Sequence, residues 1–140
     1  MSESTAIFWP MIVHAGLTFA VYPILFNRRK AAVKERSARF EDFRTPVREP
    51  EQSAAAARNL SHQYELPVLF HVVCLALFVT GGAGWLAVSL AWLFTLSRLA
   101  HAYIHLGSNQ LSQRIPAFAA GLVLVGLLWL SLAVHLVLGG

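Results

Sequence analysis

The sequence predicts an all-α fold: a polytopic membrane protein built as an antiparallel bundle of four transmembrane helices. The 140 residues are 56% hydrophobic, and their mean hydropathy is +0.57. Charged residues make up only 13% of the chain, which is about half of the ~25% usual in soluble domains. Several apolar stretches approach the roughly 20 residues that a helix needs to cross a bilayer. The length fits a single transmembrane domain over residues 1–140.

The first span is expected at residues 6–26, an apolar stretch that a basic run at 27–30 ends. Because the positive charge follows this stretch instead of preceding it, we interpret it as a retained helix and not as a cleaved signal peptide. The segment 27–53 is polar and holds Pro46 and Pro50, which argue against a continuous helix. We therefore predict a cytoplasmic loop there, with some helix near its start.

Three further spans are expected at residues 54–80, 85–106 and 114–138. The second starts with an alanine-rich lead-in that favours helix, so its helix is expected to begin outside the hydrocarbon. Pro67 removes one backbone hydrogen bond within this span. This allows two interpretations: a kink just past Glu65 that widens a cavity, or a proline that the membrane helix tolerates. The glycine-rich run at 81–84 is predicted to be a tight turn, and short connections of this kind give up-and-down neighbours in a bundle.

The basic residues predict the orientation of the chain. All eleven Lys and Arg lie in the first loop or toward those ends of spans two, three and four that share its side of the membrane. By the positive-inside rule this side is cytoplasmic, and both termini face away from the cytoplasm. The same distribution accounts for the pI of about 9.8, so the positive charge does not indicate binding to nucleic acid.

Seven titratable side chains are expected to gather at the basic end of the bundle. They are Arg58, His62 and Glu65 in the second span, Arg98, His101 and His105 in the third, and Arg114 at the start of the fourth. Within each set of three, the spacing of i, i+3 or i+4, and i+7 places the side chains on one helical face. A charge at membrane depth costs roughly 2.5–3.5 kcal/mol on insertion scales, so such residues usually face the bundle interior or a wet cavity.

Glu65 is the only acidic residue inside the predicted spans, and it has several arginines as candidate partners. One structural interpretation is a buried clamp between Glu65 and Arg98 that holds spans two and three together. One carboxylate cannot neutralise Arg58, Arg98 and Arg114, however, and the surplus of positive charge predicts a site for an anion. A guanidinium group binds carboxylates and phosphates bidentately, so a carboxylate-bearing ligand and a lipid headgroup both stay open.

The other residues with reactive side chains have a structural interpretation. Cys74 lies inside an apolar stretch, where a single cysteine usually acts as a small apolar filler. His14, His71 and His135 have no charged neighbour at helical spacing. No HExxH motif is present and the cysteine lies within the membrane, so no metal site is expected.

Two stretches resemble a known family: "RNLSHQYELPVLF" and "SRLAHAYIHLGSNQLSQRIPAF". They are similar to the membrane-associated proteins in eicosanoid and glutathione metabolism, the MAPEG family, and the resemblance extends over most of the chain. The family pattern in the second span is an arginine, an asparagine four residues on, a glutamate three further, and then a proline. Arg58, Glu65 and Pro67 match this pattern, and His62 stands where asparagine is usual.

In the third span the family has an arginine and, three residues on, a histidine, which Arg98 and His101 match. His105 stands where the eicosanoid enzymes of the family have a tyrosine. Arg114, nine residues further, matches the arginine that those enzymes place beside the glutathione sulfur. The two histidines that depart from the pattern make the chain more similar to the bacterial-type branch than to the eicosanoid enzymes, so we expect the bacterial inner membrane as its location.

The resemblance implies a homotrimer in which glutathione, as co-substrate, binds between neighbouring protomers near the cytoplasmic side. It implies a transferase or peroxidase whose glutathione thiolate attacks a lipophilic electrophile from the bilayer, with Arg114 as the catalytic residue that stabilises the thiolate. The implied glutathione-binding residues are Arg58, His62, Glu65, Arg98, His101 and His105. The family also has a member that binds fatty acids without catalysis, so a non-catalytic protein that binds a fatty acid or an anionic lipid in this pocket is the alternative.

Overall fold

Every regular element in the described part of the chain is a helix. The computed structural model of the protein describes residues 2–36, 38–44, 48–62, 64–107 and 111–139. In chain order the elements are the 3₁₀ helix η1 (Ser2–Ile7), α1 (Phe8–Lys34), the 3₁₀ helix η2 (Phe40–Arg44), α2 (Glu51–His62), α3 (Leu66–Thr80), α4 (Trp85–Leu106) and α5 (Leu111–Val137). The predicted all-α fold class is confirmed.

Four helical segments are long and apolar enough to cross a membrane: Thr5–Lys34, Glu51–Thr80, Trp85–Leu106 and Ser112–Val137, of which the second contains both α2 and α3. Large apolar side chains remain exposed along them, including Phe19 at 72%, Trp85 at 79% and Val137 at 83%. Soluble domains rarely expose so much contiguous apolar surface. The chain is therefore an integral, multi-pass membrane protein, as the sequence predicts.

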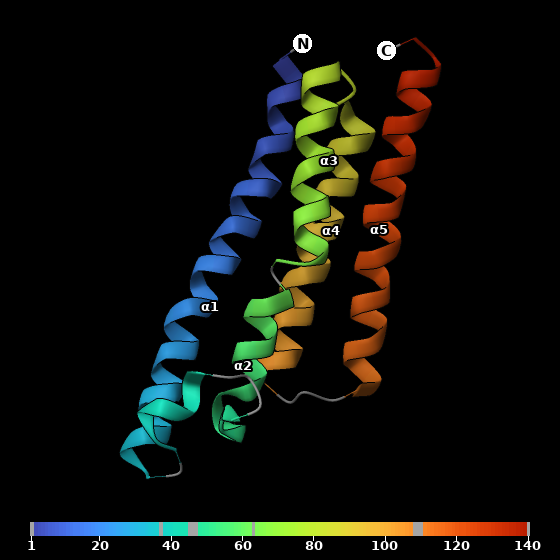
Figure 1. Cartoon of the computed structure of the whole chain (residues 1–140). Coiled ribbons are helices and arrows are strands. Elements are labelled where there is room, and N and C mark those ends of the chain that lie inside the picture. The colour runs from blue at the N-terminus through green and yellow to red at the C-terminus, as the bar shows by residue number, and fades with distance from the viewer. Residues whose placement is uncertain (1, 37, 45–47, 63, 108–110, 140) are drawn as a thin grey trace.

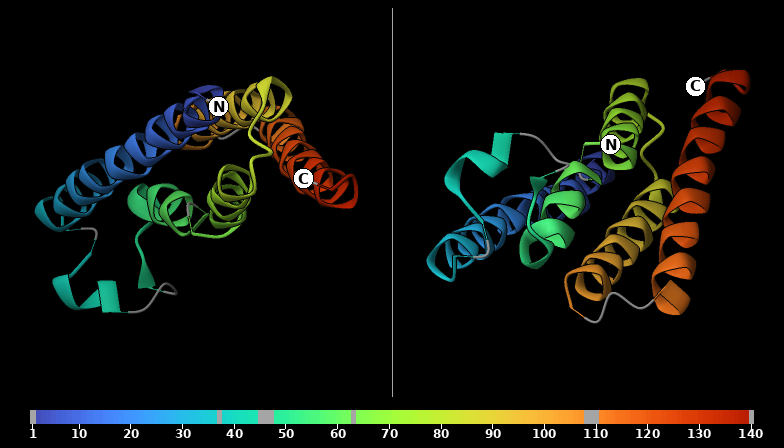
Figure 2. Two further views of the ribbon diagram at one scale, coloured as in Figure 1. Left: turned by 90° about the horizontal axis from the view of Figure 1, so that it is seen from above. Right: turned by 60° about the horizontal axis from the view of Figure 1, so that its bottom comes forward.

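The four spans run alternately down and up, with α2 and α3 together making the second, and both termini lie at one end of the bundle (Figure 1). The α4 helix packs along α5, while α1 packs on α2 and α4, and α3 packs on α5. Seen along the bundle, α1, α4 and α5 form an arc, and α2 and α3 lie on its inner side (Figure 2). The last turns of α1 and α4 and the first turns of α2 and α5 lie at the end away from the termini, and most of the basic residues belong to segments at this same end.

The centre of the bundle is an apolar core shared by α3, α4 and α5. Its largest pair is Phe70 and Phe94, whose ring centroids lie 4.4 Å apart in a stacked arrangement. Ala87 and Ala91 on α4 are almost fully buried, and small side chains of this kind let membrane helices approach closely. Cys74 is buried in this core, in agreement with its interpretation as an apolar filler.

The α1 helix continues past the predicted apolar span, to Lys34. Alanine and lysine favour helix, so the chain stays helical after its apolar stretch ends. The basic residues at 28–30 consequently lie on α1 and not in a loop. Arg28 donates a hydrogen bond from Nη2 to the carbonyl of Leu106, at 2.9 Å, and so satisfies one of the carbonyls that the end of α4 leaves without a helical partner.

The second span is broken near Pro67, where a kink and a tolerated proline were the two interpretations. The α2 helix ends at His62, and α3 begins at Leu66. Pro67 is buried in the first turn of α3, where its missing N–H leaves no helical hydrogen bond unmade. Glu65, the residue before this helix, has φ −106° and ψ −97°, outside the helical region. Two separate helices therefore take the place of both interpretations, because Pro67 starts a helix and does not interrupt one.

The turn between α3 and α4 is held by α5. Gly81 ends α3 in the left-handed region with φ +79°, a conformation that glycine adopts without strain. His135 on α5 donates a hydrogen bond from Nε2 to the carbonyl of Thr80, at 2.8 Å. A Cβ atom at Gly82 would lie 2.8 Å from Cδ2 of the same imidazole. The residue at 82 must therefore be glycine for His135 to reach the turn.

We predict that Gly82→Ala lowers the free energy of unfolding by about 1–3 kcal/mol, the usual cost of forcing an extra methyl group into packed surroundings. The measurement is the thermal unfolding of the detergent-solubilised protein. Gly84→Ala is the matched control, because no heavy atom lies within 4 Å of a Cβ atom at Gly84. Equal losses for the two variants would contradict the role given to His135.

Candidate functional site

A cavity of about 440 Å³ opens between α2, α4 and α5 at the end of the bundle away from the termini. Its lining residues are Arg58, Glu65, His101, His105, Arg114, Ile115 and Phe118. Five of the seven side chains expected to form the site border this one space. The topology brings them together, since the end of α2, the last turns of α4 and the first turn of α5 meet here.

The cavity wall carries two guanidinium groups, two imidazoles and a single carboxylate. This surplus of positive charge is the property that would attract an anion, and guanidinium groups bind carboxylates in bidentate geometry. Ile115 and Phe118 add an apolar side, and both are exposed on the surface of α5. The space therefore combines cationic groups with an exposed apolar side.

His101 and His105 lie on successive turns of α4 and form the buried side of the cavity. They are only 2% and 1% exposed, and their ring centroids lie 5.7 Å apart. The ring of Phe118 on α5 lies 6.0 Å from that of His101. The two imidazoles are thus held by packing between α4 and its neighbours, while Arg58 and Glu65 at the opposite side are exposed to the surroundings.

Asn59 is a residue near the site that the sequence did not single out. It is fully buried, and its Nδ2 donates a hydrogen bond to Nδ1 of His105 at 3.3 Å. With Nδ1 as acceptor, a neutral His105 carries its proton on Nε2. The available signal was the spacing of Ser53, Ala56 and Asn59, which are all fully buried and recur every three residues along one face of α2.

Arg98, a predicted site residue, does not line the cavity. It is 1% exposed and lies one turn deeper on α4 than His101. A Cβ atom at Gly121 of α5 would lie 3.5 Å from Cδ of Arg98, an ordinary contact distance, so the side chain of Arg98 lies beside α5. His62, the remaining predicted site residue, ends α2, and its side chain lies outside the described residues.

The predicted clamp between Glu65 and Arg98 is not formed through the buried nitrogens of the guanidinium group. Within the described parts of the chain, neither Nε nor Nη1 of Arg98 has a hydrogen-bond partner. Glu65 is exposed and lines the cavity, whereas Arg98 is buried and does not.

Arg98 shares the middle of the bundle with a histidine that the sequence assigned to the core. His14 on α1 is fully buried, and its ring stacks on Phe94 with centroids 5.9 Å apart. His71 on α3 packs edge-on against the same histidine ring at 5.3 Å. These aromatic contacts support the structural interpretation of both histidines.

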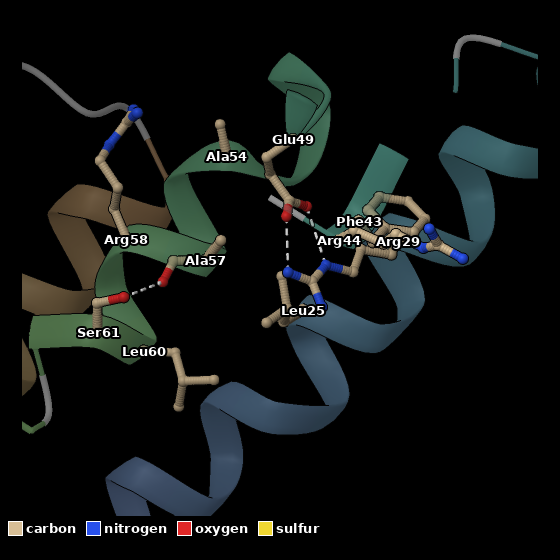
Figure 3. Close-up of a pocket in the computed structure, with 10 residues that line it drawn as sticks. All are labelled: Leu25, Arg29, Phe43, Arg44, Glu49, Ala54, Ala57, Arg58, Leu60 and Ser61. Carbon is tan, nitrogen blue, oxygen red and sulfur yellow. Dashed lines mark hydrogen bonds and ion pairs between the residues drawn. The ribbon is translucent and has the colours of Figure 1, made fainter. Parts of the chain in front are cut away.

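A second cavity, of about 340 Å³, lies on the other side of α2, between α2, η2 and α1 (Figure 3). Arg29 on α1 donates two hydrogen bonds to the carboxylate of Glu49, from Nε at 2.9 Å and from Nη2 at 2.6 Å. Glu49 also accepts a hydrogen bond from Ser53, and the guanidinium carbon of Arg29 lies 5.1 Å from the centroid of the Phe43 ring. Arg58 borders both cavities and points away from this ion pair.

The fold and the cavity define a class: small membrane proteins of four antiparallel helices with a cavity lined by basic side chains at the end opposite the termini. Within this class, a family model of the MAPEG family matches residues 7–134. The chain therefore belongs to the MAPEG family, as its resemblance in two stretches predicted. The same comparisons found no match among curated proteins and none among solved structures.

The buried amide of Asn59 provides a prediction. Asn59→Ala leaves a ring nitrogen of His105 without this donor, and losing one partner of a buried hydrogen bond costs about 1–3 kcal/mol. We expect a corresponding loss of thermal stability in detergent. Ser61→Ala is the control, since the Ser61 hydroxyl is exposed and bonds within its own helix, to the carbonyl of Ala57. If both variants unfold like the wild type, Asn59 does not join α2 to α4.

The ion pair of Arg29 and Glu49 predicts a pH dependence. Burial would raise the pKa of Glu49, but the hydrogen bonds from Arg29 and Ser53 and the charge of Arg29 bring it below the ordinary value of 4.5. A carboxylate with a lowered pKa stabilises the folded state above the ordinary value, and this contribution is lost as the pH falls through the lowered one. Near neutral pH the wild type should therefore unfold at a higher temperature than Glu49→Gln, and the difference should close below pH 4.5. A difference that stays constant with pH would contradict this account.

Proposed function

We propose that the protein is an integral membrane transferase or peroxidase that uses glutathione against lipophilic electrophiles. Membership of the MAPEG family supports a membrane function of the glutathione-related or eicosanoid type. The observation that carries the finer proposal is the cavity itself, where two arginines, two histidines and a glutamate converge beside apolar side chains. These are the groups that a small peptide with carboxylates, an amine and a thiol would require.

The cavity offers a partner for each charged part of glutathione. The guanidinium group of Arg58 is suited to a carboxylate of the peptide, and the carboxylate of Glu65 is suited to its amine. Arg114, at the first turn of α5, is the cation that would lie beside the sulfur. A positive charge there lowers the pKa of a thiol, and the thiolate is the nucleophile. His101 and His105 would add hydrogen bonds from the buried side.

The reaction expected of this arrangement is a nucleophilic attack. The thiolate sulfur forms a bond to an electrophilic carbon, and the displaced electron pair leaves with the departing group or is protonated on the neighbouring atom. A lipophilic substrate can approach from the bilayer, past Ile115 and Phe118, which are exposed on α5. Water reaches the same space from the polar end of the bundle, so a water-soluble thiol and a lipid-soluble electrophile can meet there.

The proposal includes the assembly and the orientation. Exposed apolar side chains along all four spans leave surface for neighbouring protomers as well as for lipid. From the family we infer a homotrimer with glutathione bound between protomers. The exposed positions of Arg58 and Glu65 leave room for such a neighbour. The basic end would face the cytoplasm of a bacterial cell, with both termini on the far side of the inner membrane.

The alternative is a non-catalytic protein that holds a fatty acid or an anionic lipid in the same cavity. The apolar side formed by Ile115 and Phe118 favours it, because an acyl chain could follow these side chains while a carboxylate or phosphate meets the arginines. Native mass spectrometry of the extracted protein distinguishes the two. Lipid that co-purifies and is not displaced by glutathione would favour the alternative.

The proposal predicts that glutathione forms a thiolate on the wild-type protein and not on Arg114→Ala. The measurement is the ultraviolet difference absorbance of the thiolate at saturating glutathione. Arg39→Ala removes an exposed arginine outside the cavity and should leave the signal unchanged.

Thermal unfolding provides the control for binding. A ligand that binds only the folded state raises the melting temperature of the protein. When the ligand concentration is 100 times the Kd, the free energy of unfolding rises by about 2.7 kcal/mol. Glutathione should therefore stabilise the wild type and Arg114→Ala alike if Arg114 acts on the sulfur only. A wild type that shows neither a thiolate nor stabilisation by glutathione would exclude the proposed function.

A further inference from the structure

A separate groove lies outside the bundle, along the basic end of α1. Its volume is about 890 Å³, and its walls are α1, the aromatic side chains of η2, and Leu60 of α2. None of its lining residues borders the cavity of the proposed function, so a ligand in this groove is independent of that function. We propose that this groove is a binding site for an anionic phospholipid.

The groove has the shape and polarity of a site for an acyl chain. It follows α1 from Tyr22 to Lys34, about 18 Å at 1.5 Å per residue, from the end of the apolar span into the basic segment. Phe26 is 73% exposed and Phe40 is 80% exposed along its sides. One acyl chain of one leaflet would cover these rings over their length.

The groove also lies within the segment that holds the net charge of the protein. Residues 28–44 contain seven basic and three acidic side chains, a net charge of +4. The other four basic and four acidic residues of the chain cancel, so this one segment accounts for the whole formal charge of +4. Lysine and arginine beside a membrane surface attract anionic lipid headgroups.

The positive charges stand at the correct end of the groove for a phospholipid. Lys30 and Lys34 line its polar end, and Arg44 borders the adjoining smaller cavity. Among the described residues, none of these three side chains forms an ion pair. Tyr22 lies at the other end, toward the middle of the bundle. A phosphate at the lysines therefore directs an acyl chain along α1 into the hydrocarbon.

The wall of the groove opposite α1, formed by η2, is held in place by contacts within the protein. The ion pair between Arg29 and Glu49 and the contact of Phe43 with Arg29 fix η2 and the start of α2 against α1 (Figure 3). Because Arg29 is neutralised by Glu49, its role in the groove is structural. Lys30, Lys34 and Arg44 are the cations that would bind the headgroup. The hydroxyls of Tyr22 and Tyr64 lie 2.6 Å apart, which ties the inner end of the groove to the break between α2 and α3.

The test is native mass spectrometry of the full-length protein released from vesicles of equal parts phosphatidylglycerol and phosphatidylcholine. The wild type should retain phosphatidylglycerol in preference. The double variant Lys30→Glu, Lys34→Glu should reduce this preference about tenfold, a change expected when two headgroup cations are reversed. The control is Arg39→Glu, Arg48→Glu, which changes the net charge equally at exposed positions outside the groove, and it should retain the wild-type preference.

The proposal is wrong if the wild type retains both lipids equally, or if the two double variants lose phosphatidylglycerol equally. It is also wrong if phosphatidylglycerol is lost from the wild type only in those species whose mass shows a different oligomeric state. That last result would mean that a second copy of the chain occupies the groove. A wild-type experiment avoids any folding defect of the variants. Phosphatidylglycerol with a photoactivatable acyl chain should label peptides within residues 22–43, and labelling confined to α4 and α5 would equally exclude the site.

Discussion

The break in the second membrane span is the constraint on which the rest of this structure depends. Because α2 ends at His62 and α3 begins at Leu66, the two helices can pack on different neighbours. The α2 helix lies against α1 and α4, whereas α3 lies mainly against α5. One continuous straight helix could not pack against α1 and α4 over its first half and against α5 over its second half. The break therefore lets one span form a wall of the cationic cavity and also fill the centre of the bundle.

The sequence predicts the fold because the signals that determine it are local or compositional. The length of the apolar stretches, the glycine turn and the one-sided distribution of arginine and lysine require no knowledge of packing. The break was not predictable in the same way. Pro67 can kink a helix from within or start one, and the alanine-rich residues before it favour a continuous helix. Only packing on α1 and α4 decides between these outcomes.

Most of the candidate site was predictable from spacing and topology together. Helical spacing places His101 and His105 on one face of α4, and up-and-down connectivity brings Arg114 to the same end. Depth is the property that spacing does not give. Arg98 lies on the same face but one turn deeper, where its side chain lies beside Gly121 of α5. Asn59, as a partner of His105, and Glu49, as a partner of Arg29, depend on contacts between helices that no local pattern encodes.

The two cavities on either side of α2 share one charged residue, Arg58. Arg58 borders both the functional cavity and the smaller cavity beside η2, so its guanidinium group can serve only one of them at a time. On the η2 side, the carboxylate of Glu49 is already neutralised by Arg29. On the cavity side, Glu65 is the only carboxylate among the lining residues. Among the described residues Arg58 forms no ion pair, so an anionic ligand would meet a cation that costs little to reorient.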